Sequence, residues 1–172
     1  MLEAENHEFF MREALLEAER ALGLGEVPVG AVVVAGGEVL ARACNLRESL
    51  RDPTAHAEVL ALREAARKRG SWRLNGAAVY VTIEPCPMCA GALVQARVSL
   101  LVFGVRDPKA GSAGSLVNLV RFPGFNHRLE VVEGVLAEDC RRLIRGFFEA
   151  KRKQRDRGEV AELAEGARLE IE

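Results

Sequence analysis

Residues 77–91, AAVYVTIEPCPMCAG, contain a buried strand that is followed directly by the start of a helix. Residues 77–83 are apolar, aromatic or β-branched throughout, which favours a strand covered on both faces. Proline is favoured in the first turn of a helix, so we expect a helix over residues 85–97. A strand that leads straight into a helix is typical of an α/β domain. Two cysteines, Cys86 and Cys89, stand at this junction.

The other expected elements follow from apolar periodicity and from the positions of glycine and proline. Apolar residues at helical spacing predict a helix over residues 8–22. Two β-rich runs, residues 29–35 and 39–43, flank Gly36 and Gly37 and predict a hairpin. Further expected elements are a helix over 54–69, strands over 100–104 and 129–132, a short helical segment over 116–121 and a terminal helix over 137–157. Together they indicate a central sheet with helices on both faces.

The length of 172 residues fits one domain, since domains typically run ~100–200 residues. We therefore assign residues 1–157 to a single domain. Residues 158–172 show no clear apolar face, and we expect them to form a loosely ordered tail.

Composition narrows the class of protein. Hydrophobic residues make up 49% and charged residues 28%, as in ordinary globular proteins. No apolar run approaches the ~20 residues that span a bilayer, and the acidic start lacks a signal-peptide pattern. The four cysteines are too irregularly spaced for a disulfide framework. We therefore expect no membrane association and a cytoplasmic location.

The formal net charge of −1 hides one strongly basic segment. Residues 141–157 carry eight cationic side chains against two acidic ones. Such a segment indicates either contact with a polyanion or a solvated helix face.

The spacing of Cys86 and Cys89 fits a disulfide, a redox pair or part of a metal site. A third metal-binding residue type, His56, stands near the start of another expected helix, and Glu58 follows two positions later. Two helix starts can meet at one edge of an α/β sheet, where ligands tend to bind. Three ligands plus an open position are typical of catalytic zinc, whereas structural zinc has four protein ligands. Glu58, left uncoordinated, would transfer protons for a water that zinc activates.

The His-x-Glu and Pro-Cys-x-x-Cys motifs, with Cys86 30 positions after His56, resemble those of the zinc-dependent nucleobase deaminases. Longer stretches resemble the bacterial tRNA-specific adenosine deaminases of that superfamily. They are EVPVGAV (26–32), DPTAHAE (52–58), EPCPMCAGAL (84–93), VFGVRDPKAGSAGS (102–115), NHRLEV (126–131) and GVLAEDC (134–140). The resemblance runs from about residue 8 to residue 155.

This resemblance implies a cytidine deaminase-like α/β fold, a three-layer sandwich with a five-stranded mixed sheet between helices. It also implies one Zn²⁺ per subunit, a homodimer and conversion of adenosine to inosine at the wobble position of a tRNA anticodon. An arginine tRNA with an ACG anticodon is the expected substrate. The alternatives are a deaminase of a free base or nucleotide, such as guanine or a cytidine nucleotide, and a zinc-stabilised RNA-binding module. The basic segment disfavours the first alternative, and an uncoordinated Glu58 disfavours the second.

The resemblance further implies a substrate pocket. Asn45 would hydrogen-bond the purine, and Val29 and Ala57 would help to wall the base. The backbone N–H of Ala57 would hold the attacking oxygen, and Asp107 would contact the ribose. From the residues alone, Asn45 at a strand end and Asp107 before a proline also fit ordinary turn positions.

Three residues of the terminal helix complete the expected contacts. Phe147 and Phe148 would stack on neighbouring bases of the anticodon loop, and Arg152 would contact the RNA backbone. Because Phe147 and Phe148 are adjacent on one helix, both cannot face the same core, and we expect Phe148 to be the RNA contact of the two.

Overall fold

A computed structural model describes residues 4–169 of the chain. Five strands and five helices lie within this part. In chain order they are α1 (Ala4–Gly23), β1 (Gly30–Ala35), β2 (Glu38–Cys44), α2 (Arg47–Leu50), α3 (Ala57–Arg69), β3 (Ala78–Ile83), α4 (Pro87–Gln95), β4 (Leu100–Val105), β5 (Glu130–Glu133) and α5 (Ala137–Leu169).

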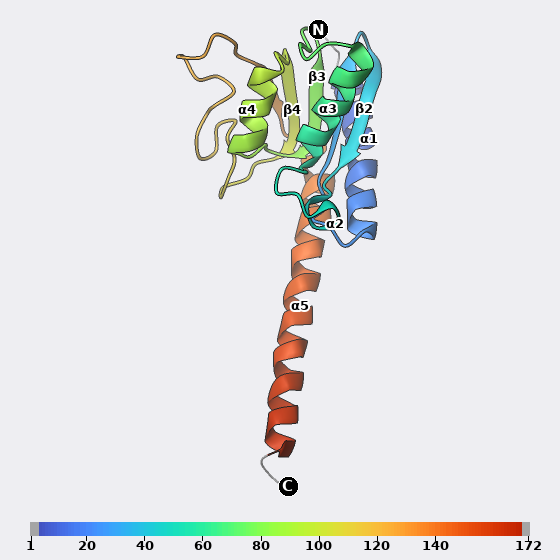
Figure 1. Cartoon of the computed structure of the whole chain (residues 1–172), viewed down its shortest axis with the longest axis vertical. Helices are drawn as coiled ribbons and strands as arrows, with labels where there is room; N and C mark the ends of the chain where they lie inside the picture. The colour runs from blue at the N-terminus through green and yellow to red at the C-terminus, as the bar shows by residue number, and fades with distance from the viewer. Residues whose placement is uncertain (1–3, 170–172) are drawn as a thin grey trace.

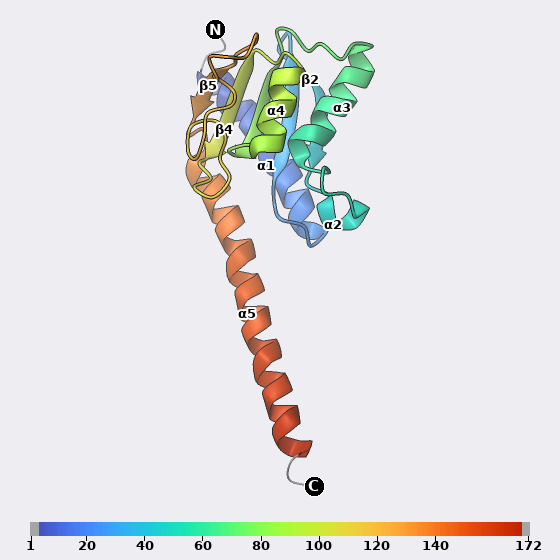
Figure 2. The same cartoon turned by 60° about the vertical axis from the view of Figure 1, so that its left-hand side comes forward.

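The five strands form one mixed sheet in the order β2-β1-β3-β4-β5. β1 runs antiparallel to both β2 and β3, whereas β3, β4 and β5 are parallel to one another. Helices α3 and α4 cover one face, and α1 and the start of α5 cover the other (Figures 1 and 2). The predicted three-layer α/β fold with a five-stranded mixed sheet is confirmed.

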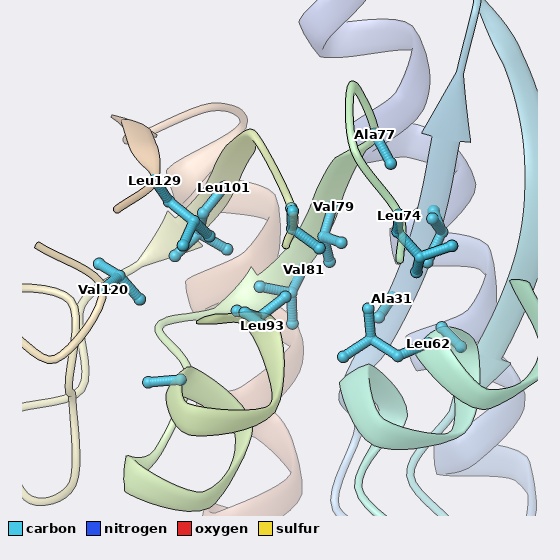
Figure 3. Close-up of a cluster of buried hydrophobic side chains, with 14 of the residues drawn as sticks. Ala31, Leu62, Leu74, Ala77, Val79, Val81, Leu93, Leu101, Val120 and Leu129 are labelled. Carbon is cyan, nitrogen blue, oxygen red and sulfur yellow. The ribbon is translucent and has the colours of Figure 1, made fainter. Parts of the chain in front are cut away.

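Strand β3 lies at the centre of two hydrophobic cores, one on each face of the sheet. Val79 and Val81 point toward α3 and α4, where they meet Leu93 (Figure 3). Ala78 and Tyr80 point to the opposite face and pack beneath α1 and α5. Side chains alternate along a strand, so a strand buried on both faces requires the continuous apolar sequence found here.

Helix α1 lies directly against β1 at Gly30. A Cβ built on Gly30 would approach the Ala18 backbone nitrogen to 2.5 Å and Glu17 Cβ to 2.8 Å, and it would overlap the Ala14 carbonyl oxygen. No larger residue fits at this position unless α1 moves away from the sheet. The glycine therefore sets the distance between the first helix and the sheet.

The predicted helical segment over residues 116–121 is wrong, because these residues form turns and one isolated bridge between Ala113 and Asn118. Their amides find partners outside any helical pattern. Leu116 N–H donates to the Gly111 carbonyl and Leu119 N–H to the Ser112 carbonyl. The short helix α2 was not predicted.

Helix α5 has 33 residues, about 50 Å at 1.5 Å per residue. It packs on the sheet only at its beginning and then extends away from the body of the molecule (Figures 1 and 2). The sequence analysis ended this helix at residue 157, whereas the structure continues it to Leu169. Glutamate, alanine and leucine in this stretch favour a helix despite its two glycines. The loose order expected for residues 158–172 stays a prediction.

Among residues 4–169, no helix combines the length and the apolar character that crossing a membrane would require.

Candidate active site

The three expected metal ligands converge at the starts of α3 and α4. His56 is the N-cap residue of α3, Cys86 is the N-cap residue of α4, and Cys89 lies in the first turn of α4. His56 Nδ1 lies 3.6 Å from Cys86 Sγ and 3.5 Å from Cys89 Sγ. Zinc bonds of ~2.0–2.3 Å in tetrahedral geometry place nitrogen and sulfur ligands about 3.6 Å apart. The donor set and its spacing therefore fit a zinc ion.

The ionisation of the cysteines also suits a metal. The pKa of Cys86 falls to about 4, because Cys89 and then His56 offer hydrogen bonds to its sulfur. The pKa of Cys89 is raised, because its proton is shared with Cys86 and because the thiol is buried. The start of a helix favours negative charge as well. A metal cation would replace the shared protons and hold both sulfurs as thiolates.

Glu58 lies in the first turn of α3, beside the metal ligands but outside their group. Its side chain is only 3% exposed. Burial raises the pKa of this carboxyl group, and the negative charge of Cys86 raises it further. A carboxyl group with a raised pKa is better suited to accept a proton and pass it on than an ordinary carboxylate.

A cavity of about 770 Å³ opens in front of these residues. This volume lies in the range of small-molecule sites, roughly 300–1,000 Å³. The predicted site residues that line it are His56, Glu58, Cys86, Val29, Asn45, Ala57, Asp107, Phe148 and Arg152. The structure thus brings together segments that lie far apart in the sequence. The roles of these residues toward a substrate remain predictions.

Asn45 is 7% exposed, and neighbouring backbone fixes its carboxamide in place. Its Nδ2 donates to the Val27 carbonyl at 3.2 Å, and its Oδ1 accepts from the Arg47 N–H at 3.2 Å. A carboxamide has two N–H groups and two lone pairs on oxygen. One of each is therefore left over for a base in the cavity.

The two adjacent phenylalanines of α5 lie on different sides of the helix. Phe148 is 46% exposed and lines the catalytic cavity. Phe147 lies in a second hollow of about 960 Å³ between α1 and α5, where Leu15 and Leu143 are its neighbours. The two rings are 5.3 Å apart and nearly perpendicular. A direct contact of Phe147 with a base in the catalytic cavity is not favoured by this placement.

A cationic rim surrounds the cavity, and only half of it was predicted from the sequence. The rim consists of Arg47, Arg106, Lys109, Arg141, Arg145 and Arg152. The last three share one side of α5, whereas Arg47 begins α2 and Arg106 and Lys109 lie in the loop after β4. The basic composition of residues 141–157 indicated the helical part. No sequence signal placed Arg47, Arg106 and Lys109 opposite α5.

Two buried carboxylates, which hold the walls of the cavity, were also not predicted. Glu26 accepts hydrogen bonds from the N–H groups of Glu48 and Ser49 at the start of α2. Glu84, at the end of β3, accepts hydrogen bonds from the loop that follows β4. An acidic residue directly after a buried strand was the available signal for Glu84.

A mixed sheet of this order, with a His/Cys/Cys group that could hold a metal ion beside a buried glutamate, is the arrangement of a deaminase. The family profile of the MafB19-like deaminases matches residues 5–152. The tRNA-specific adenosine deaminase of Bacillus subtilis (strain 168) is 53% identical over 148 residues, which are 86% of this chain and 92% of that protein. The chain belongs to the family of tRNA-specific adenosine deaminases.

Solved structures agree with this assignment. A structure from studies of A-to-I editing by tRNA:A34 deaminases at the wobble position of transfer RNA is 42% identical, with a TM-score of 0.76. The match covers 78% of this chain and 98% of that one. A guanine deaminase from Bacillus subtilis is 37% identical, with a TM-score of 0.57, over 63% of this chain and 69% of that one.

Proposed function

We propose that this protein hydrolyses adenosine to inosine at the wobble position of a tRNA anticodon. The observation that carries the proposal is the cavity of about 770 Å³ beside Glu58 and the metal group, which is rimmed by six cationic residues. A free base has no phosphates to pair with such a rim, whereas a nucleotide within an RNA strand has one on each side. The family assignment points to the same substrate.

His56, Cys86 and Cys89 would hold one Zn²⁺ per subunit, and zinc at this site supplies a nucleophilic water at neutral pH. Glu58 takes a proton from the attacking water and delivers it to the purine ring nitrogen next to the amine-bearing carbon. It then takes the remaining proton from the hydroxyl that is now bonded to this carbon and delivers it to the amine. The carbon–nitrogen bond breaks, and the amine leaves as ammonia. One carboxyl group with a raised pKa serves both transfers.

The pocket walls orient the base for this reaction. Asn45 offers its remaining N–H and lone pair to the edge of the purine. Val29 and Ala57 bound the space for the ring. The first N–H groups of a helix have no partner within the helix, so the Ala57 N–H at the start of α3 can hold the attacking oxygen.

The RNA contacts come from both sides of the cavity. Asp107 lies on the loop side and would contact the ribose, while Arg152 and the exposed Phe148 lie on α5. Bases of an anticodon loop are readily splayed, so flipping the wobble adenosine costs little, and Phe148 can stack on a neighbouring base. We propose an arginine tRNA with an ACG anticodon as the substrate.

The decisive experiment is inosine formation on an ACG anticodon stem-loop. Wild-type protein should convert the wobble adenosine, whereas free adenosine, which lacks the flanking phosphates, should react very slowly. Free guanine and cytidine are assayed in parallel for ammonia release. Turnover of guanine without turnover of the stem-loop would make the protein a small-molecule deaminase.

A homodimer in the cytoplasm is part of the same proposal. Size-exclusion chromatography with light scattering, run with and without the stem-loop, measures the mass of the protein and tests the dimer.

A further inference from the structure

The side chain of Glu84 is almost completely buried, with 2% exposure, and every donor around it belongs to one loop. Its Oε2 accepts from the Asp107 N–H at 3.0 Å and from the Ser115 hydroxyl. Its Oε1 accepts from the Ala113 N–H at 2.9 Å and from the Ser115 N–H at 3.0 Å. Three backbone N–H groups and the Ser115 hydroxyl thus converge on the two oxygens, so the side chain holds the loop at four points.

The loop that supplies these donors, residues 106–115, is folded around the carboxylate. A Cβ built on Gly111 would lie 2.5 Å from Glu84 Cδ and would overlap Oε2. The Gly111 N–H in turn donates to the Asp107 carbonyl at 2.8 Å. The glycine therefore leaves the space that Glu84 fills, and the two residues are matched to each other.

The position of Glu84 in the chain links this loop to the metal group. Glu84 is two residues before Cys86 and continues β3, the central strand of the sheet. The loop carries Arg106, Asp107 and Lys109, which line the catalytic cavity. One rigid carboxylate thus connects the cysteine end of the site with the wall that faces the ribose.

We infer that Glu84 is a positioning residue for RNA recognition. It fixes the Asp107 backbone, and with it the ribose contact, at a set distance from the metal ligands. This inference rests on the proposed function, because it assigns Glu84 a role in placing the RNA substrate. Both carboxylate oxygens of Glu84 are occupied by hydrogen bonds from the loop, so its effect should pass through the loop and chiefly through Asp107.

The test is Glu84→Gln, which has the same shape but replaces one oxygen with an NH₂ group. The Ser115 hydroxyl can rotate and accept a hydrogen bond from this group, but the Asp107 N–H cannot. The variant should keep its zinc. Hydrogen exchange of the backbone amides should become faster over residues 107–115, while that of α3 should be unchanged. KM for the stem-loop should rise, with kcat nearly unchanged, so that kcat/KM falls about tenfold to hundredfold.

A double-mutant cycle separates positioning from general destabilisation. In an Asp107→Ala background, Glu84→Gln should lower kcat/KM by less than about threefold, because the residue through which it acts is already gone. The matched control is Glu26→Gln, which removes an equally buried carboxylate from the opposite wall. Its effect should be the same in both backgrounds.

Gly111→Ala provides a second variant that leaves the charge in place. It should displace the carboxylate and reproduce the rise in KM, whereas Gly23→Ala, at the open end of α1, should not. The inference is overturned if Glu84→Gln has wild-type kinetics, or loses equal activity with and without Asp107. Loss of zinc without faster exchange over residues 107–115 would also overturn it. Absence of inosine with the wild-type protein would instead refute the proposed function, and the exchange measurements would still test the anchoring of the loop.

Discussion

Glu58, Glu26 and Glu84 are all buried carboxyl groups, yet their surroundings give them different ionisation. The pKa of Glu58 is raised because burial disfavours its charged form. Burial acts in the same direction on Glu26 and Glu84, but hydrogen bonds from backbone and serine donors outweigh it and lower both pKa values. Glu58 can therefore exchange protons, while the other two remain ionised and hold the cavity walls.

Replacing Glu58 should separate catalysis from metal binding. Glu58→Gln should retain about one zinc per subunit and lose deamination by at least 10²–10⁴-fold, the usual contribution of a general acid–base group. His56→Ala should lose zinc as well. Metal analysis and inosine formation are measured on the same samples, with Glu64→Gln on the outer side of α3 as the control. Loss of zinc from Glu58→Gln would show that Glu58 is a metal ligand.

The lowered pKa of Glu26 predicts a pH-dependent stability. A folded-state pKa below the ordinary value of 4.5 stabilises the fold above that pH, and this stabilisation is lost as the pH falls through the folded-state value. Glu26→Gln should therefore lower the free energy of unfolding at neutral pH, and its difference from wild type should shrink in acid. Urea unfolding across this pH range measures the difference. A constant difference would contradict the ionised state of Glu26.

At the scale of the elements, α1 and β1 depend on the missing side chain at Gly30. Gly30→Ala should push α1 off the sheet and destabilise the fold by ~1–3 kcal/mol or more, the usual effect of overpacking. Gly23→Ala adds the same methyl group in open space and should be close to neutral. Thermal unfolding of the two variants compares them directly. Equal melting temperatures would mean that the contact between helix and strand can relax.

The cationic side chains of α5 lie on two sides of the helix, so RNA binding should depend more on one side than on the other. Arg145 and Arg152 face the catalytic cavity, whereas Arg142 and Lys151 line the hollow next to α1. Replacing Arg145 and Arg152 with glutamine should weaken stem-loop binding and reduce the salt slope by ~0.7–0.9 for each lost phosphate contact. Replacing Arg142 and Lys151 with glutamine removes the same charge and should weaken stem-loop binding less. Equal effects would show that only the net charge of α5 matters.

Much of the fold could be predicted from the sequence where local pattern and packing agree. The apolar run of β3 and the proline that follows it located the strand, the helix and two metal ligands. The prediction of a helix over residues 116–121 was wrong although the segment is rich in apolar residues. Its amides donate to the carbonyl groups of Gly111 and Ser112 through turns. Local sequence does not encode such partners.

The site was predictable to a similar degree. The His-x-Glu and Cys-x-x-Cys motifs indicated the chemistry, since the chemistry itself restricts residue type and spacing. Glu84 and Arg47 carry no such restriction, and their importance follows from where the sheet places them. The two sides occupied by Phe147 and Phe148 follow from helical geometry, and the preference for Phe148 as the RNA contact stays a prediction.

For the molecule as a whole, metal binding should stabilise the fold, because its ligands come from two helices that only the folded sheet brings together. Chelation should lower the melting temperature, and added zinc should restore it. The free energy of unfolding rises by about 4 kcal/mol when the free zinc concentration is a thousand times its Kd. His56→Ala should melt at the same temperature with and without chelator. A wild-type melting temperature insensitive to chelator would argue against a zinc site.

The order of elements along the chain has a consequence for synthesis. His56, Glu58, Cys86 and Cys89 all lie within the first 89 residues, whereas the wall with Arg145, Phe148 and Arg152 belongs to α5, the last element. Chains fold as they emerge from the ribosome, beginning at the N-terminus. The wall that we propose to hold the RNA is therefore translated last. A stalled nascent chain that exposes residues 1–136 should retain zinc but fail to capture the stem-loop.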